Sequence, residues 1–418
     1  MQTIERNTYL NQLVSGRNNG LIKVVTGIRR CGKSFLLFNL FYDYLLSQGV
    51  PDNHIIKIAF DDLFYEEYKN PHKLLAYIKE QITDQSTYYI LLDEVQMMDN
   101  FVGALNSLMH IRNADIYVTG SNSKFLSSDI ATEFRGRGDE IRIYPLSFSE
   151  YFSVYEGGKR DAWSEYCLYG GLPLVIGLDS EQKKANYLHN LYNTVYRKDL
   201  EERNNIKKVD EFDKLVKIMA SSIGAPCNPN KLSNTFKSVE SVDLKPETIG
   251  NYLSHLQDAF LLEKALRYDI KGKKYIGTLS KYYFTDVGLR NAILDFRQQE
   301  ESHIMENVIY NELRIKGFSV DVGQVEKRSR NDGGGTIRKQ LEVDFVANLG
   351  SKRYYIQSAL AVPDAEKMAQ ESASLKNVSD NFKKIIIVKE TTSPWYNTDG
   401  ILILGLFDFL LKPDSLEY

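Results

Sequence analysis

Residues 23–41 read KVVTGIRRCGKSFLLFNLF, and this stretch decides the fold. The β-branched and apolar residues at 21–26 predict a short buried strand, and the apolar run at 34–40 predicts the start of a helix. The loop between them matches the pattern G-x-x-x-x-G-K-[ST], with the members Gly27, Ile28, Arg29, Arg30, Cys31, Gly32, Lys33 and Ser34. A strand, this loop and a helix in succession predict an α/β domain with a phosphate-binding loop.

The loop has the chemistry that a nucleoside triphosphate requires. Its glycines allow backbone N–H groups to face phosphate oxygens, and the N-terminus of the helix adds positive potential. We expect Lys33 to reach the β- and γ-phosphates and the Ser34 hydroxyl to ligate Mg²⁺. Phe35 would complete the ATP-binding segment that begins at Gly27. The alternative is a glycine turn at a strand–helix junction with a surface lysine.

A second hydrophobic run ends in adjacent carboxylates, because residues 88–94 read YYILLDE. A strand buried on both faces would deliver Asp93 to its carboxyl end beside the phosphate loop, where it can hold Mg²⁺ through water. Glu94, one residue further, would polarise the water that attacks the γ-phosphate. A strand ending in a solvated acidic turn is the competing interpretation.

A third run, ADIYVTGSNS at residues 114–123, predicts another buried strand that ends in small polar residues. Ser121 and Asn122 are the candidates to hold the attacking water or to touch the γ-phosphate, and Asn122 has the longer reach. The same residues are also ordinary turn formers, so this motif has weight only beside the other two.

Length, charge and hydropathy set the class of protein. A chain of 418 residues is too long for one core, so two to four domains are expected. The net charge of −3 describes no global polycation, so any basic surface must be local. The longest apolar segment, residues 400–412, is too short to span a membrane, and the first residues contain no apolar core of the kind that a signal peptide has. Three cysteines far apart in the sequence fit a reducing cytosol, so we expect a soluble, cytoplasmic protein with no membrane partner.

These motifs resemble those of the AAA+ ATPases. The resemblance is carried by VVTGIRRCGKS, YILLDEVQ, VTGSNSKFLSS and FRGRGDEIRIYPLSFSEYF. More narrowly, the chain is similar to a large bacterial and archaeal group whose members carry a C-terminal domain of unknown function with a nuclease-like fold. The later stretches YGGLPLV, KYYFTDVGLRNAIL, ENVIYNEL and LEVDF extend the similarity over nearly the whole chain.

The resemblance implies a five-stranded parallel sheet and nucleotide-dependent assembly or conformational change, and it makes a homo-oligomer a candidate. It also puts Asn122 near the sensor position. Arg135 or Arg137 resembles an arginine finger that acts on a neighbouring subunit, and an arginine suits this role because it is always charged and binds phosphate with two hydrogen bonds. The alternative for both arginines is a local salt bridge with the nearby acids Glu133, Asp139 or Glu140.

Two segments follow the predicted ATPase core of residues 1–148. Residues 149–220 have helical periodicity and resemble a helical lid with its connector. Residues 221–297 predict a winged helix–turn–helix, with its second helix in KPETIGNYLSHLQDAFLLEKAL and a basic turn between two strands. Such modules lay the second helix in the major groove of DNA, and six basic residues at 264–281 against one acid support phosphate contact. The alternative for this module is docking of a protein partner.

The last segment, residues 298–418, reads as helix–strand–strand–strand–helix–strand, an order that resembles the restriction-endonuclease-like fold. In that fold a helix Glu, a strand Asp and an E-x-K strand gather Mg²⁺. Glu306 or Glu312 could supply the first carboxylate, and Asp344 the second. Gln357 and Ala359 stand where the acid and the lysine belong, so a hydroxide nucleophile would lose its nearest cation. We predict a nuclease-like shape that is not catalytic.

The sequence thus predicts a cytosolic Mg²⁺-dependent ATPase that converts nucleotide state into movement of C-terminal recognition modules, with DNA or an unidentified protein as partner. Two other functions stay open: a regulatory protein that holds ATP as a switch with negligible turnover, and an ATP-controlled endonuclease. Glu94 favours turnover over switching, and the missing lysine at position 359 argues against cleavage.

Overall fold

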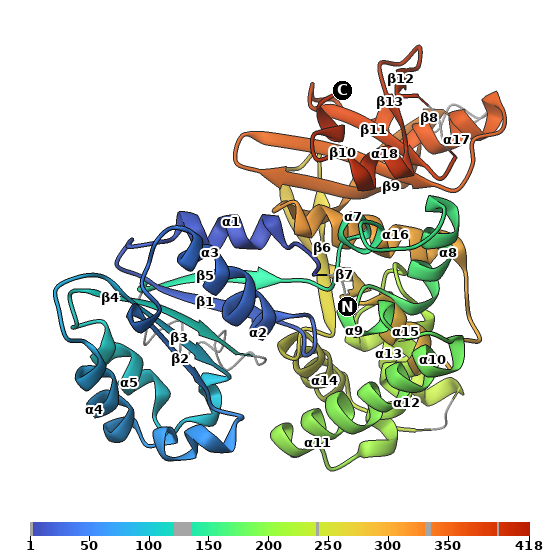
Figure 1. The fold of residues 1–418 in the computed structure, drawn as a ribbon. Coiled ribbons are helices and arrows are strands. Elements are labelled where there is room, and N and C mark those ends of the chain that lie inside the picture. The colour runs from blue at the N-terminus through green and yellow to red at the C-terminus, as the bar shows by residue number, and fades with distance from the viewer. Residues whose placement is uncertain (1–2, 121–135, 240–241, 331–335, 391–392) are drawn as a thin grey trace. The chain divides into compact units, whose positions relative to one another are not determined.

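The computed structural model describes residues 3–120, 136–239, 242–330, 336–390 and 393–418 (Figure 1). The chain divides into two compact units. Unit 1 comprises Met1–Leu146, Leu172–Gly177 and Asp258–Phe260. Unit 2 comprises Ser147–Gly171, Leu178–Gln257 and Leu261–Tyr418.

Unit 1 contains a five-stranded sheet with the strand order β2-β3-β4-β1-β5, in which every neighbouring pair is parallel. Its strands are β1 (Ile22–Gly27), β2 (Ile55–Ala59), β3 (Tyr88–Asp93), β4 (Ala114–Thr119) and β5 (Gly138–Ile143). Every residue of β1 and β3 is buried, as expected where helices cover both faces of a parallel sheet. The predicted α/β domain with a five-stranded parallel sheet is confirmed.

Helices lie on both faces of this sheet (Figure 1). The first half of the unit contributes α1 (Asn7–Ser15), α2 (Lys33–Phe35), the π-helix η1 (Leu36–Phe41) and α3 (Tyr42–Ser47). The other helices are α4 (Pro71–Gln81) and α5 (Phe101–Leu108), with short 3-10 turns at Asp52–His54, Leu63–Lys69 and Val95–Met97. The apolar sides of α4 and α5 pack with strand residues into one buried core, which includes Leu74, Ile78, Ile90, Leu105 and Val118.

Unit 2 begins with a helical region. Its helices are α7 (Phe148–Phe152), α8 (Lys159–Tyr169), α10 (Glu181–Asn190), η6 (Leu191–Arg197), α11 (Lys198–Asn204), α12 (Val209–Ser221), α13 (Pro229–Val239) and α14 (Pro246–Asp258). The short helix α9 (Pro173–Ile176) falls within the Leu172–Gly177 segment of unit 1.

Tyr169–Gly171 of the YGGLP motif meet the FTDVG motif in unit 2, where α8 packs against α15 (Val287–Ile293). The Asp286 carboxylate accepts hydrogen bonds from the backbone N–H groups of Gly171, at 2.8 Å, and Leu289, at 2.9 Å. A Cβ at Gly288 would lie 2.0 Å from the Tyr169 carbonyl oxygen, so only glycine permits this approach.

The second sheet has eight strands in the order β12-β13-β11-β10-β9-β8-β6-β7. Its strands are β6 (Leu262–Asp269), β7 (Lys274–Phe284), β8 (Ser319–Arg330), β9 (Thr336–Leu349), β10 (Lys352–Ala359), β11 (Lys383–Val388), β12 (Trp395–Tyr396) and β13 (Leu402–Gly405). Three more helices are α16 (Glu301–Ile315), α17 (Ala365–Lys376) and α18 (Leu406–Leu411). The β6–β7 hairpin follows α14, where the wing was expected, and β6 also pairs in parallel with β8. The hairpin is therefore continuous with the C-terminal sheet.

Two further findings concern the helices and the cysteines. In the part of the chain that the structure describes, no helix combines the length and the apolar character that crossing a bilayer requires. Cys31, Cys167 and Cys227 are all free thiols.

Candidate nucleotide-binding site

The loop at the end of β1 has the backbone conformation of a phosphate-binding turn. Gly27 has a φ of 145°, and a Cβ there would lie 2.2 Å from the Ile143 carbonyl oxygen. Arg30 and Gly32 also have positive φ, at 64° and 100°. The helix that starts at Lys33 follows at once, and the Leu36 N–H donates to the Gly32 carbonyl at 2.9 Å. The turn is thus tight at Gly27 and left-handed where the helix begins.

The Lys33 side chain is folded onto the loop. It is 4% exposed, and its Nζ donates to the carbonyl oxygens of Gly27 and Ile28, each at 3.1 Å. These two contacts hold the ammonium inside the turn, where phosphate oxygens could replace the carbonyls as acceptors.

Asp93, Thr119 and Ser34 meet at the carboxyl edge of the sheet. Asp93 ends β3 and is 3% exposed. The Thr119 hydroxyl at the end of β4 donates to its Oδ1, and the Ser34 side chain lies close enough to lower the pKa of this carboxyl. Parallel strands bring residues from three separate segments to one point here.

Glu94 directly follows Asp93 and is held in an unusual conformation. Its φ of 52° lies in the left-handed region, which few non-glycine residues adopt. Its backbone N–H donates to the Thr119 hydroxyl oxygen at 3.0 Å, and Gln96 Nε2 donates to its Oε2. Thr119 therefore contacts both acidic residues, as a donor to one and an acceptor for the other.

The site is acidic where it is buried. Burial raises the pKa of Asp93, and repulsion from Glu94 and Asp61 adds to this, while the hydrogen bonds from Thr119 and Ser34 oppose it. A cation would relieve the repulsion, and the oxygen donors of Ser34 and Asp93 suit Mg²⁺. No three His, Cys, Asp or Glu side chains of the described residues gather closely enough to hold a metal by themselves.

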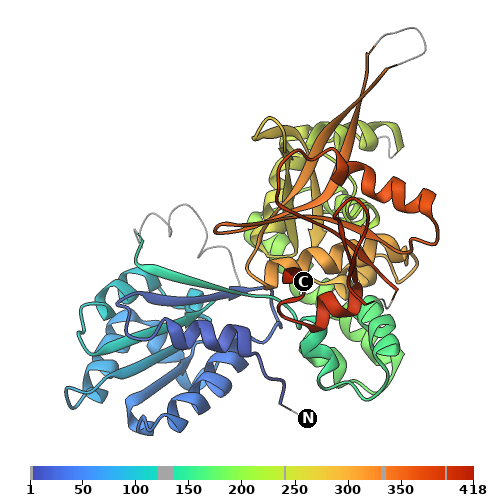
Figure 2. The same cartoon turned by 90° about the horizontal axis from the view of Figure 1, so that it is seen from above.

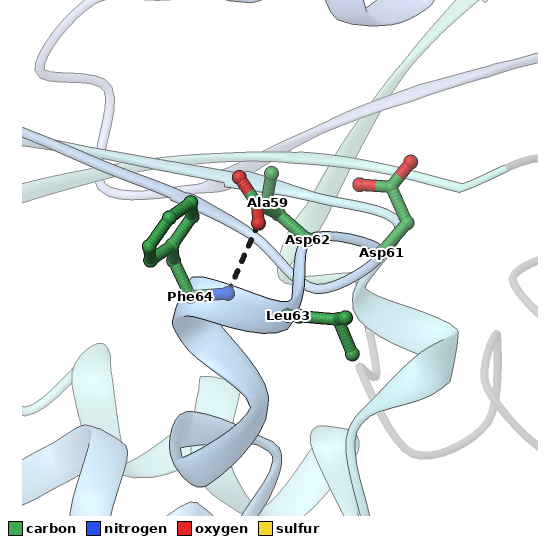
Figure 3. Close-up of a pocket in the computed structure, with 5 residues that line it drawn as sticks. All are labelled: Ala59, Asp61, Asp62, Leu63 and Phe64. Carbon is green, nitrogen blue, oxygen red and sulfur yellow. Dashed lines mark hydrogen bonds between the residues drawn. The ribbon is translucent and has the colours of Figure 1, made fainter.

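An open pocket lies at the same edge of the sheet, where β2 ends (Figure 3). β2 runs beside β3, and Ala59 pairs with Asp93. Asp62 accepts a hydrogen bond from the Phe64 N–H at 3.0 Å, whereas Asp61 points away from that turn (Figure 3). Leu63 and Phe64 are 84% and 90% exposed. Asp61 thus extends the acidic edge, next to two exposed apolar side chains.

Arg6 supports the loop from the N-terminal segment and was missed by sequence reasoning. Its guanidinium donates to the carbonyl oxygens of Cys31, at 3.0 Å, and Tyr144, at 2.7 Å, and the residue is 4% exposed. No periodicity or motif distinguishes this arginine, because its partners are backbone atoms far along the chain. Thr119 was also missed, although a polar residue ending a buried strand was a usable signal.

The remaining predicted loop residues differ in exposure, and Arg137 lies away from the loop. Ile28 and Cys31 are buried, Arg29 is half-buried, and Arg30, Ser34 and Phe35 are exposed. Arg137 is exposed and directly precedes β5, where its carbonyl accepts from the Ile22 N–H at 2.9 Å. This is the amino-terminal edge of the sheet, opposite the phosphate loop. Asn122 and Arg135 lie outside the described residues.

A second charged cluster lies in unit 2. Lys281 of β7 is 3% exposed, and its Nζ contacts Glu306 at 2.9 Å and Glu342 at 2.8 Å. Tyr283 also donates to Glu306, at 2.7 Å. Asp344 belongs to the same cluster: burial raises its pKa, Glu306 repulsion adds to this, and Lys281 opposes it. Lys281 is therefore committed to carboxylates and is not available for the phosphate contact that its place in a basic segment suggested.

Gln357 and Ala359 carry no charge, and Glu312 lies outside the Lys281 cluster. Gln357 accepts a hydrogen bond from the Ser374 hydroxyl at 3.2 Å, and Ala359 is buried in an apolar core. Glu312, the alternative first carboxylate, lies near Lys316 at 3.6 Å instead of in the Lys281 cluster.

Known families and proteins resemble this chain over most of its length. The AAA domain family matches residues 19–152, and a domain of unknown function, DUF8612, matches residues 160–300. An uncharacterized protein of Haemophilus influenzae is 34% identical over 418 residues, which covers 98% of this chain and 99% of that protein. The uncharacterized protein MJ1544 of Methanocaldococcus jannaschii is 28% identical over 398 residues, covering 91% of this chain and 83% of that protein. Among solved structures, the Aeropyrum pernix Orc1 protein in complex with DNA shares 13% identity and a TM-score of 0.28, covering 70% of this chain and 93% of that one. That score is too low to carry an argument.

Proposed function

The chain belongs to the AAA-domain protein family, and from this premise we propose that it is a Mg²⁺-dependent ATPase. The observation that carries the proposal is the convergence of the phosphate loop with the carboxyl ends of β3 and β4, where Thr119 donates to Asp93 and Ser34 lies close enough to lower the pKa of the same carboxyl. A loop hydroxyl and a strand carboxylate in contact form the pair that holds Mg²⁺ in P-loop ATPases.

Each residue of the site has a role that its chemistry supports. Lys33 exchanges its two carbonyl partners for the β- and γ-phosphate oxygens of ATP. Ser34 and Asp93 would hold Mg²⁺, which would supply positive charge beside the phosphates. Glu94 polarises the attacking water. Asn122 is proposed to position that water, and Arg135 or Arg137 to act on the phosphate of a neighbouring subunit.

We propose that nucleotide state is coupled to movement in unit 2. The chain supports this because it crosses between the two units five times, at 146–147, 171–172, 177–178, 257–258 and 260–261. A conformational change at the phosphate loop would therefore act on unit 2 through several covalent connections.

Two variants test the ATPase. Lys33→Ala should abolish ATP binding in calorimetry, because the loop loses the cation that contacts the phosphates. Lys57→Ala is the matched control, since Lys57 lies on β2 with its Nζ 3.5 Å from the Tyr42 ring centroid, away from the loop.

Glu94→Gln should keep ATP binding while hydrolysis falls by about two orders of magnitude. Tight ATP binding by Lys33→Ala would refute the site, and wild-type turnover by Glu94→Gln would remove Glu94 from the mechanism.

One observation favours the alternative of an ATP-held switch. Gln96 donates a hydrogen bond to the Glu94 carboxylate, the group that would have to polarise water. If this contact persists with ATP bound, turnover would be low while binding stays tight. Wild-type protein that binds ATP tightly and hydrolyses it negligibly would support the switch.

The third function, an ATP-controlled endonuclease, has less support. Gln357 and Ala359 carry no charge, and Lys281 is already paired with Glu306 and Glu342. We propose that this part of unit 2 recognises a partner and does not cut nucleic acid. Metal-dependent plasmid cleavage that disappears in Asp344→Ala would favour the endonuclease instead.

A further inference from the structure

The β8–β9 hairpin extends past the rest of its sheet. β6 pairs with β8 only at residues 322–324, and β10 pairs with β9 only at residues 345–349. From Glu326 and Gln340 outward, the register pairs the two strands with each other alone in the described part of the chain. Figure 2 shows this hairpin projecting from unit 2. We call residues 326–330 with 336–340 the β8–β9 ribbon.

The register of the ribbon sets like charges directly opposite one another. Lys327 pairs with Lys339, and Arg328 pairs with Arg338. Opposed like charges destabilise an antiparallel pair. Glu326 forms an ion pair with Arg328 and lies 4.0 Å from Arg338, but neither lysine of the ribbon forms an ion pair with any residue that the structure describes. The ribbon thus holds an excess of positive charge that a bound polyanion would balance.

The two basic pairs lie on opposite faces of the ribbon, because side chains alternate along a strand. All four side chains are exposed, with Arg328 at 56% and Arg338 at 64%. The major groove of B-DNA is about 12 Å wide, admits a two-stranded ribbon and has phosphates along both sides. The major groove of A-form RNA is too deep and narrow for side chains to read.

A second basic element lies beside the ribbon. The β6–β7 turn exposes Lys271, Lys273 and Lys274. This turn follows Asp269, which pairs with Gln324 of β8, two residues before the ribbon begins at Glu326. The hydrogen bond from Arg328 lowers the pKa of the Glu326 carboxyl, and the charge of Lys271 acts in the same direction. The turn therefore adds phosphate-contacting charge next to the base of the ribbon.

Helix α14, by contrast, is poorly suited to a polyanion. Its sequence PETIGNYLSHLQD contains no lysine or arginine. Its exposed residues include Glu247, Asn251 and Ser254. A helix lying in the major groove would bring Glu247 toward phosphates without a compensating cation on the same helix.

We propose that the β8–β9 ribbon, assisted by the Lys271–Lys274 turn, is a binding surface for double-stranded DNA that enters the major groove. This assignment keeps DNA as the ligand predicted for the winged helix, but it places the contact on the C-terminal sheet instead of on α14. It does not require ATP hydrolysis.

The experiment measures binding of the full-length chain, without nucleotide, to a labelled DNA duplex over a series of salt concentrations. The variants are Lys327→Gln with Lys339→Gln, and Arg328→Gln with Arg338→Gln. The matched control is Lys183→Gln with Lys198→Gln, which removes two exposed lysines from helices α10 and α11 that pair with Asp179 and Glu202. Omitting nucleotide separates the result from the ATPase test, so one proposal can fail while the other stands.

Each ribbon variant should weaken binding roughly tenfold or more, and the slope of log K against log salt should become shallower by about two. The control variant should bind as the wild type does. The melting temperature of the variant with Lys327→Gln and Lys339→Gln should not fall, because it removes a like-charge pair, and this separates lost contact from lost folding. The arginine variant also loses the ion pairs with Glu326, so its affinity is interpreted beside that of the lysine variant. Unchanged DNA affinity in both ribbon variants, an equal loss in the control, or equal affinity of the wild type for duplex RNA would overturn the proposal.

Discussion

At the scale of single residues, Thr119 connects the two acids of the nucleotide site. Its hydroxyl donates to Asp93 and accepts from the Glu94 backbone N–H. The first bond lowers the pKa of a carboxyl that burial raises, so it favours the ionised form that Mg²⁺ needs. The second helps to hold Glu94 in its left-handed conformation.

Thr119→Val should therefore impair hydrolysis without unfolding the domain. Valine has the same shape, but it leaves the Glu94 N–H without its acceptor and lets the Asp93 pKa rise further. The loss of one hydrogen bond to a charged group predicts roughly a tenfold lower kcat. The acidic limb of the pH–rate profile should move to higher pH. Thr119→Ser, which keeps the hydroxyl, is the control, and a Thr119→Val enzyme with an unshifted profile would contradict the role.

At the scale of elements, the features of the site that depend on neighbouring residues were predicted, and those that depend on pairing between distant segments were not. The strand before Gly27, the helix after Lys33 and the buried strand that ends at Asp93 were all evident, because each follows from neighbouring residues. The order of helices and strands after residue 298 was also predicted, from α16 to β11. Within each segment, the hydrophobic periodicity and the turn residues carry this information.

What the sequence did not reveal depends on contacts between distant segments. Arg6 reaches the carbonyl of Tyr144, and Lys281 reaches Glu306 and Glu342 on a helix and a strand that come later in the chain. The parallel pairing of β6 with β8 joins a predicted wing to another predicted segment. None of these contacts has a local signature, because a side chain's partners across the fold are set by packing.

Helix α16 carries a buried carboxyl that makes the stability of unit 2 depend on pH. Burial raises the pKa of Glu312 from 4.5 to about 7, and nearby Lys316 opposes this. Between these values the folded chain keeps a proton that the unfolded chain releases. The free energy of unfolding should therefore fall as pH rises through this window, by up to about 3 kcal/mol for this group. Burial likewise raises the pKa of Asp286, to about 6, so its effect has the same sign.

Tryptophan fluorescence can follow this change selectively, since Trp163 and Trp395, the two tryptophans of the chain, both belong to unit 2. Glu312→Gln should flatten the dependence of unfolding on pH between pH 4.5 and about 7. Asp408→Asn, which changes an acid whose partner Lys412 lies 2.8 Å away on the surface, is the control. A Glu312→Gln protein with the pH dependence of the wild type would show that this carboxyl is not the cause.

At the scale of the whole molecule, the question is whether one chain contains a complete ATPase site. Arg137 stands before β5, and β5 runs parallel to β1 with Gly138 opposite Ile22 and Ile143 opposite Gly27. Five residue steps along a strand cover roughly 17 Å. An arginine side chain cannot span that distance to the phosphate loop of its own subunit. If Arg137 contacts the γ-phosphate at all, it must do so in a neighbouring copy.

The specific ATPase activity should accordingly rise with protein concentration if Arg137 acts in trans. Arg137→Ala should reduce kcat by about a hundredfold or more while ATP binding is kept, because an arginine that stabilises the transferring phosphate contributes mainly to the transition state. Arg112→Ala is the control, since Arg112 is an exposed arginine just before β4, at the same amino-terminal edge of the sheet.

Mixing Lys33→Ala with Arg137→Ala should restore part of the activity, because each variant supplies the group that the other lacks at a shared interface. A monomer in sedimentation whose specific activity is independent of concentration, with no recovery on mixing, would remove Arg137 from the mechanism and leave Lys33, Ser34, Asp93 and Glu94 to act within one chain.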